Sequence, residues 1–404
     1  MIKLDIYDTL VVAGLVLLCG RLLVAKLGVL NRYTIPSPVA GGLFTAIILL
    51  FAKIGFNWQV NFDLSLQEPL MLAFFASVGL NSNIELLRAG GKKMTTFLLA
   101  VVGLLFIQDG VGVVLTKVLH LNSLLGLIAG SITLSGGHGT GAAWGRIFVD
   151  KYHFNGAIEA AMACATFGLV FGGIIGGPIA QYLIKKHKLQ ISNIEVESDN
   201  PIDTTAFEKP EAKRSVNSAA MIETIIMLTI CLTLGKYIAA LIHDTRFALP
   251  SFVCVLFIGV VISNVVPRIS NYQIVERSVS ILGNVSLSLF LAMALMNLRL
   301  WDLASLALPM IIILLIQTVI MALYAVYVTF RIMGKNYDAA VLAAGHCGFG
   351  LGATPTAIAN MQIVSEKFGP SHIAFIIVPI VGAFFIDIVN ALVIKLFLLL
   401  PIYL

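Results

Sequence analysis

The feature that most constrains this chain is a long series of apolar segments, six before a central polar stretch and six after it. Their length and apolarity are typical of helices that cross or enter a lipid bilayer. The first set lies near residues 6–26, 37–52, 69–84, 95–118, 123–146 and 156–184, and the second near 219–242, 247–266, 279–298, 303–330, 337–360 and 371–400.

The composition agrees with a membrane protein. Hydrophobic residues make up 59% of the 404 residues, charged residues only 12%, and the mean hydropathy is +0.97. A soluble domain carries about twice that charged share, whereas lipid solvates apolar side chains directly. Near the N-terminus, Asp5 and Asp8 stand where a signal peptide has basic residues, so we expect the first segment to be retained as a span.

Charge and cysteine content exclude two other classes. The net charge of +5 comes from Lys and Arg residues scattered over short loops, which is not the clustering of a nucleic-acid-binding face. The five cysteines lie in or beside apolar runs, and their spacing matches neither a disulfide framework nor a zinc site. We therefore expect them to be packing residues.

Short motifs recur in the same order in the two sets of segments, at offsets of 208 to 216 positions. The recurrence indicates one unit used twice, residues 1–184 and residues 218–404, joined by a polar linker at 185–217. The matched pairs are Ile35-Pro36-Ser37-Pro38-Val39 with Leu249-Pro250-Ser251-Phe252-Val253, Phe74-Phe75-Ala76 with Phe290-Leu291-Ala292, Phe106-Ile107-Gln108 with Leu315-Ile316-Gln317, and Gly137-His138-Gly139 with Gly345-His346-Cys347.

The distribution of basic residues predicts the orientation. If the N-terminus is outside and the fifth segment of each half does not cross, sixteen of the 26 Lys and Arg residues fall in inside loops and seven in outside loops. Each half then crosses five times, which inverts the second half relative to the first, and inverted repeats are typical of alternating-access carriers. We expect a cytoplasmic linker and two periplasmic termini.

The two fifth segments carry the strongest motifs, Ser135-Gly136-Gly137-His138-Gly139-Thr140-Gly141 and Gly345-His346-Cys347-Gly348-Phe349-Gly350-Leu351-Gly352-Ala353-Thr354-Pro355. Such glycine density interrupts a helix at membrane depth and exposes N–H groups that attract anions. The predicted fold is an all-α polytopic membrane protein with two inverted-topology repeats of five transmembrane helices, each with a glycine-rich re-entrant loop before its last helix. The alternative is close helix packing through small residues. The candidate substrate-binding residues are Ser135, Gly136, Gly137, His138, Gly139, Thr140, Gly345, His346, Cys347, Gly348, Phe349, Gly350 and Thr354.

His138 and His346 occupy matching positions in these motifs. They could carry protons near neutral pH, or each could stabilise the bend of its loop by hydrogen bonding. No carboxylate or cysteine cluster accompanies them, so a transition-metal site is not expected.

A sodium site needs oxygen ligands, and Asp387 and Asn390 offer them on one face of the last segment. An ionisable residue at mid-span is a functional candidate by default. A buried structural hydrogen bond or a polar turn is the alternative for this pair. Asp109, Thr166 and Ser77 are further candidates, although the two hydroxyls could simply bond their own helix backbone.

Long stretches of the chain resemble the bacterial sodium/glutamate symporter family. They include Tyr33-Thr34-Ile35-Pro36, Leu70-Met71-Leu72-Ala73-Phe74-Phe75, and the two glycine motifs with their flanks from Ser131 to Trp144 and from Ala344 to Pro355. The resemblance covers essentially the whole chain apart from residues 187–206. It implies sodium-coupled uptake of L-glutamate across the bacterial inner membrane, with no organic cofactor. It also implies inverted five-helix halves, a homodimer, and an elevator-like movement of a transport domain against a scaffold.

Three other functions stay open on the residues alone. A symporter of another small di- or tricarboxylate would use similar glycine loops. An intramembrane enzyme would need Asp109 with Asp387, or His346 with Cys347, and neither pair has the sequence context of a known catalytic arrangement. A channel would use the loops as selectivity filters, but such filters usually come from symmetric subunits.

Overall fold

The structure, a computed structural model, describes residues 2–28, 30, 35–56, 60–82, 84, 91–189, 216–242, 245, 249–270, 274–298 and 307–403. This part of the chain is helical except for two short strands, β1 (Ile2–Lys3) and β2 (Val60–Asn61), which pair in parallel. Within it, eight helices are long and apolar enough to cross a membrane, and the bent pair α18–α19 would make a ninth span. The chain is therefore a multi-pass membrane protein, as its composition predicts.

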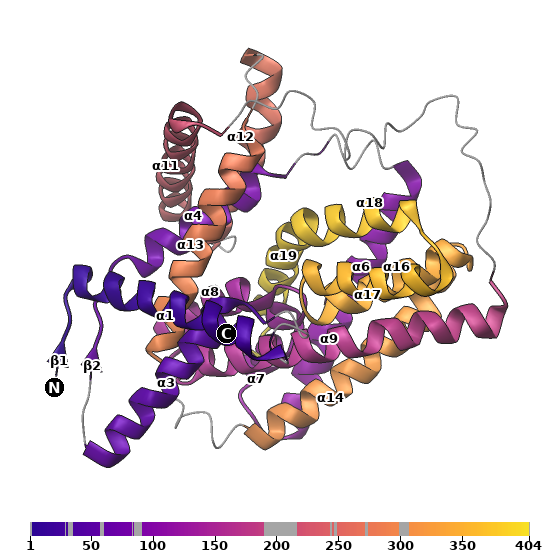
Figure 1. Ribbon diagram of the computed structural model, residues 1–404, viewed down its shortest axis with the longest axis horizontal. Helices are drawn as coiled ribbons and strands as arrows, with labels where there is room; N and C mark the ends of the chain where they lie inside the picture. Colours follow the sequence, from indigo (N-terminus) through magenta and orange to yellow (C-terminus); the bar gives the residue numbers. More distant parts are fainter. Residues whose placement is uncertain are drawn as a thin grey trace.

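The helices form two bundles, each built from both halves of the sequence (Figure 1). The first, called bundle A, takes the early helices of each half and lies to the left in the view. Its members are α1 (Ile6–Lys26), α3 (Ser37–Phe56), α4 (Gln67–Leu80), α11 (Ser218–Leu241), α12 (Ser251–Ser270) and α13 (Glu276–Met296).

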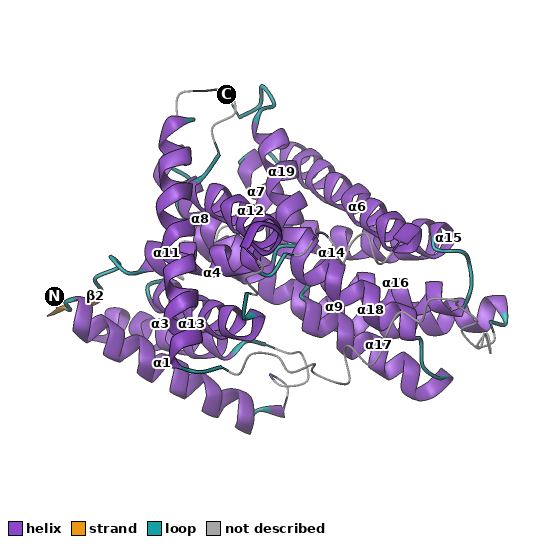
Figure 2. Ribbon diagram, turned by 90° about the horizontal axis from the view of Figure 1, so that it is seen from above, coloured by secondary structure: helices purple, strands orange, loops and turns teal. Residues whose placement is uncertain are grey.

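The second, bundle B, takes the later helices of each half. From the first half it contains α6 (Gly91–Val118), α7 (Ser123–Leu127), the π-helical turn η1 (Ile128–Ile132), α8 (Gly137–Tyr152) and α9 (Ala157–His187). From the second half it contains α14 (Ala307–Tyr324), η3 (Ala325–Thr329), α15 (Phe330–Ile332), α16 (Tyr337–Leu351), α17 (Thr354–Phe368), α18 (His372–Ile380), η4 (Val381–Phe385) and α19 (Ile386–Leu398). The main contacts between the bundles join α8 to α13 and α12 to α19. In the view from above, α1 and α3 of bundle A lie on the left and α16 and α17 of bundle B on the right (Figure 2).

Helices α9 and α16 pack closely at the centre of bundle B because glycine leaves room for backbone. A Cβ added to Gly168 would lie 1.9 Å from the carbonyl oxygen of Leu351, a distance that no real side chain could keep. One turn further on, Gly172 faces the carbonyl of Gly348 in the same way. Sequence positions about 180 apart are thus held side by side, and each half supplies one wall of the bundle.

Helix α14 shows how the sequence separates lipid from protein. Leu308, Ile311, Leu315 and Val319 are exposed at helical spacing, as a surface solvated by lipid tails would be. Gln317 and Thr318 face inward instead and are buried. The outer face therefore needs no polar partner, while the inner face carries polar groups into the bundle.

The predicted apolar segments coincide with helices, and the two fifth segments, 123–146 and 337–360, are each interrupted near the middle. Segment 69–84 differs from the prediction of a full crossing. Its helix, α4, has 14 residues, about 21 Å of helix, which is shorter than the roughly 30 Å hydrocarbon core. Most of the predicted linker, residues 190–215, lies outside the described residues.

Candidate functional site

The first broken helix runs from α7 through η1 into α8. Asn122 begins it by accepting a hydrogen bond from the backbone N–H of Leu124, and Gly130 interrupts it with φ −105° and ψ −136°. Gly137, at the start of α8, has φ +68°, a conformation that glycine adopts without a steric penalty. The chain can therefore end one helical segment and begin another within residues 130–137.

The second broken helix consists of α16 and α17. Asn336 begins α16 by accepting a hydrogen bond from the N–H of Ala339. At Gly352 the backbone leaves the helical region, Ala353 is extended, and α17 starts at Thr354 with proline in its first turn. Gly136, Gly137, Ala353 and Thr354 are partly exposed between buried Ser135 and His138 in the first break and after buried Gly352 in the second, and a Cβ on Gly137 would lie 3.7 Å from the carbonyl of Gly352, so the two breaks lie close together.

The tips of the broken helices meet through two glutamines. The side-chain amide of Gln108, on α6, donates to the carbonyl of Gly350 at 2.7 Å. The hydroxyl of Ser135 donates to the side-chain oxygen of Gln108 at 2.8 Å. Gln317, on α14, donates to the backbone carbonyl of Gln108 at 2.6 Å. This network fixes the first tip against the second at a depth where lipid could satisfy none of these groups.

The two motif histidines have matching surroundings. His138 Nε2 lies 3.1 Å from the hydroxyl of Thr166, and that hydroxyl donates to the carbonyl of Met162 at 2.8 Å. Thr166 must then accept from the ring, which places a proton on His138 Nε2. His346 Nδ1 lies 2.9 Å from the hydroxyl of Thr329, and both rings are buried. Each histidine thus bonds to a threonine on another helical element, α9 or η3, and neither ring forms a hydrogen bond to its own loop among the described residues.

The structure brings three sodium candidates to the first broken helix. Asp109 is fully buried and accepts hydrogen bonds from the backbone N–H and the hydroxyl of Ser131, at 2.7 and 2.9 Å. Asn390 donates to the carbonyl of Ser131 at 2.9 Å, and its own side-chain oxygen has no partner among the described residues. Asp387, one turn earlier on α19, accepts a hydrogen bond from Thr140 on α8.

The two remaining sodium candidates have other partners. Thr166 is occupied by His138, as described above. Ser77 is on α4 in bundle A, where its hydroxyl donates to the carbonyl of Phe74, and a Cβ on Gly283 of α13 would lie 2.0 Å from it. Ser77 therefore serves the packing of α4 on α13 and is not close to the other candidates.

The substrate candidates divide into three groups. Ser135, Gly136, Gly137, Gly350 and Thr354 lie at the tips. The others on the second motif lie inside α16, where a Cβ on Gly345 would meet Val378 of α18 and one on Gly348 would meet Ala357 of α17. His138, Gly139 and Thr140 form the first turn of α8.

Comparison with known proteins now bears on these features. The sodium/glutamate symporter family matches residues 2–370. The sodium/glutamate symporter of Escherichia coli is 62% identical over 403 residues, which cover all of both chains, and that of Shigella flexneri is equally similar. The sodium/glutamate symporter of Haemophilus influenzae is 50% identical over 390 residues, 96% of each chain.

The chain belongs to the sodium/glutamate symporter family.

Membership in this family decides between the classes that the residues left open. The family is one of transporters, so the intramembrane enzyme and the channel are set aside. The family match ends at residue 370, before α19. The match to the Escherichia coli relative spans the whole chain and so includes α19.

Sequence reasoning did not assign Gln108 and Gln317, which tie the two tips together. A signal for them was present, because they close the matched motifs Phe106-Ile107-Gln108 and Leu315-Ile316-Gln317. An amide that recurs at mid-span in both halves of a transporter indicates a partner deep in the bundle. Ser131, which links Asp109 to Asn390, carried no comparable signal.

Proposed function

We propose that this protein is a secondary active transporter that takes up L-glutamate together with sodium across the bacterial inner membrane. The observation that carries the proposal is full-length identity, 62% and 50%, to proteins named sodium/glutamate symporter. The structure supports it with two helix breaks and a buried carboxylate, Asp109, bonded to the first of them. Another small di- or tricarboxylate remains the alternative substrate.

Sodium is assigned to the cluster of Asp109, Ser131 and Asn390. An ionised carboxylate in a membrane interior costs several kcal/mol unless a cation or several donors compensate it. Asp109 receives its two printed hydrogen bonds from one residue, Ser131, and has no ion pair among the described residues. Asn390 donates to the carbonyl of Ser131 in the same cluster, and its own side-chain oxygen has no hydrogen-bond partner among the described residues. Sodium prefers such hard oxygen ligands.

Glutamate is assigned to the space between the two tips. Helices α8 and α17 both begin there, at Gly137 and Thr354, and a Cβ on Gly137 would lie 3.7 Å from the carbonyl of Gly352. A helix N-terminus carries a partial positive charge and free N–H groups, which suit carboxylates. Two such ends facing one space match a substrate with two carboxylates.

Alternating access is assigned to movement between the bundles. Bundle B contains both tips and the sodium cluster, so it would be the transport unit, and bundle A would be the scaffold. In each half the chain passes from bundle A to bundle B at the same stage, which supports an inverted duplication of units 1–184 and 218–404 around the 185–217 linker. Helices α16 and α17 have 15 residues each, too few to cross alone, which supports re-entrant hairpins. The homodimer implied by the family resemblance is part of the proposal.

The net charge of glutamate gives a physical reason for coupling its uptake to sodium. Glutamate carries one net negative charge at neutral pH, and an inside-negative potential opposes its entry by about 2.3 kcal/mol per 100 mV. One cotransported sodium ion cancels this cost, and a second would make the potential a driving force. Sodium must therefore bind close to the substrate, as the shared position of Ser131 and Ser135 on the first broken helix allows.

The test is uptake of labelled glutamate by purified protein in liposomes. We expect accumulation with an inward sodium gradient and none with an equal potassium gradient. An excess of unlabelled glutamate should compete, whereas succinate and citrate should not. Sodium-independent uptake would overturn the coupling, and competition by the other acids alone would establish the alternative substrate.

The predicted orientation has its own test. Single cysteines in the linker should resist an impermeant thiol reagent in intact cells and react after the membrane is opened. Labelling of the linker from outside would reverse the assignment of both termini to the periplasm.

A further inference from the structure

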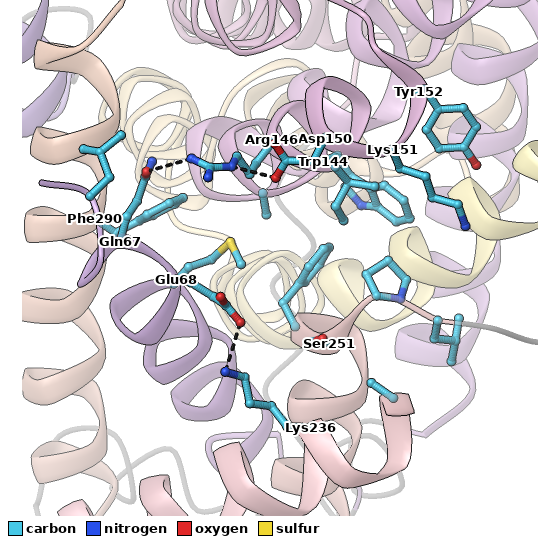
Figure 3. A pocket seen from close by; sticks show the side chains of 18 of the residues that line it. Gln67, Glu68, Trp144, Arg146, Asp150, Lys151, Tyr152, Lys236, Ser251 and Phe290 are labelled. Carbon is cyan, nitrogen blue, oxygen red and sulfur yellow. Dashed lines mark hydrogen bonds and ion pairs between the residues drawn. The ribbon is translucent and has the colours of Figure 1, made fainter. Parts of the chain in front are cut away.

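A cavity of about 810 Å³ separates the two bundles. Its walls come from α4, α11, α12 and α13 of bundle A and from α8 and α19 of bundle B, and Figure 3 shows the side chains that face it. None of the predicted substrate-binding residues lines it. Its charged lining consists of four basic and two acidic side chains, Arg146, Lys151, Lys236, Lys395, Glu68 and Asp150, which leaves an excess of positive charge.

Both acidic side chains are already paired. Asp150 accepts from Arg146 at 2.8 Å, and the same arginine reaches Gln67 across the bundle boundary at 3.4 Å. Glu68 pairs with Lys236 at 3.1 Å (Figure 3). The two remaining cations, Lys151 and Lys395, have no carboxylate partner among the described residues.

Lys151 and Lys395 reach the cavity from different helices of bundle B, α8 and α19, and their charges repel each other. Lys395 is half-buried and lies in the last turn of α19. The ammonium of Lys151 lies 5.9 Å from the centroid of the Tyr152 ring, but neither lysine has a carboxylate partner among the described residues, so an anion between the two ammonium groups would stabilise both.

The cavity does not lead directly to the tips. Lys151 is 14 residues along α8 from Gly137, about 21 Å of helix. Trp144 and Phe252 meet edge to face with ring centroids 5.6 Å apart, and both line the cavity. Closer to the tip, Gly139 packs against Phe74 and Leu287 of bundle A. An anion in the cavity would thus be bound at a position separate from the tips until the bundles move.

We propose that Lys151 and Lys395 form a capture site for a carboxylate of the incoming amino acid, distinct from the site between the tips. The inference rests on the proposed function and places this site on the predicted periplasmic side. The lysines raise the local concentration of the anionic substrate and bind it before the bundles move. Their contribution is to the apparent affinity, and sodium binding and turnover do not depend on them.

The test measures initial uptake in right-side-out vesicles for Lys151→Gln, Lys395→Gln and the double variant. We expect the KM for glutamate to rise about fivefold for each single variant and more for the double, with kcat and the sodium dependence unchanged. Raising ionic strength should raise the KM of the wild type and leave that of the double variant nearly constant, because salt screens the attraction. Lys117→Gln, an exposed lysine at the end of α6 outside the cavity, is the matched control and should behave as wild type.

The outcomes separate the two proposals. If the wild type shows no sodium-driven uptake, the proposed function fails. If the wild type transports but the double variant keeps its KM and salt dependence, the capture site is wrong. Lys151→Arg and Lys395→Arg, which keep the charge, should restore the wild-type KM, so a defect that persists in them indicates a structural role. An effect of the lysine variants seen in liposomes of anionic phosphatidylglycerol but absent in liposomes of zwitterionic phosphatidylcholine would show that the lysines bind the headgroup of an anionic lipid instead, and would also overturn the proposal.

Discussion

The first broken helix, η1–α8, and the second, α16–α17, resemble each other in their hydrogen bonds and differ in charge. Each places a histidine against a threonine, His138 on Thr166 and His346 on Thr329. The residue after each matched glutamine, however, is not the same. Asp109 follows Gln108 and bonds to the first break, whereas Thr318 follows Gln317 and donates to its own helix at Leu314.

Under the proposed duplication, this difference separates features that both halves keep from features found in one half. The glutamines, which donate to backbone carbonyls, and the histidines, which bond to threonine hydroxyls, occur in both halves because polar groups inside the bundle need partners that lipid cannot supply. A carboxylate occurs beside only one break. We infer that the two halves share an architecture and that cation binding is asymmetric, centred on Asp109.

The largest expected effect comes from replacing the residues that follow the matched glutamines, Asp109 and Thr318. Asp109→Asn removes the charge that the sodium proposal requires, so the sodium concentration for half-maximal uptake should rise by about tenfold or more, equivalent to about 1.4 kcal/mol. Thr318→Ala removes a hydroxyl that bonds to its own helix. It should change the sodium concentration for half-maximal uptake by less than about twofold. Uptake at graded sodium measures both variants. Equal shifts of the sodium concentration for half-maximal uptake in the two variants would contradict the asymmetric cation binding.

A valine in each glycine motif tests the two breaks by different mechanisms. Gly137→Val places a β-branched side chain at φ +68° and into the space between the tips, so uptake should be lost while membrane insertion is retained. Gly345→Val would instead collide with Val378 and Met361 inside bundle B, lowering stability by about 1–3 kcal/mol. Uptake, folded yield and thermal unfolding in detergent distinguish the two. Normal transport by Gly137→Val would favour the helix-packing alternative.

The smallest contrast concerns the threonines that hold the histidines. Thr166→Val and Thr329→Val keep shape but leave a buried ring nitrogen unpaired, which costs about 1–3 kcal/mol in either half. Thermal unfolding should therefore shift by similar amounts. Sodium dependence should stay constant in both variants, and a change confined to Thr166→Val would restore Thr166 as a sodium ligand.

Much of the helical layout could be predicted from the sequence. The segment at 6–26 coincides with α1 (Ile6–Lys26), and the interruptions within 123–146 and 337–360 follow from their glycines. Apolarity and glycine density are local properties, so they can be read without knowing the fold. The prediction that α4 crosses as a full helix did not hold, because hydropathy does not set where a helix begins and ends.

The division into two bundles could not be predicted in this way. It depends on which helices approach closely, as α9 and α16 do where Gly168 meets Leu351. The sequence around a glycine does not show which residue that glycine contacts. The same limit applies to the site. Asp109 and Asn390 were separate candidates 281 positions apart, and only folding joins them through Ser131.

The central claim is that sodium binds at Asp109 and Asn390 on the first broken helix. Its most direct test is the binding of radiolabelled sodium to purified protein, with excess potassium present and labelled glutamate binding followed in parallel. We predict saturable sodium binding by the wild type, loss of it in Asp109→Asn, weaker binding in Asn390→Ala, and wild-type binding in Thr318→Ala. Sodium binding by Asp109→Asn at wild-type affinity and amount would contradict the account.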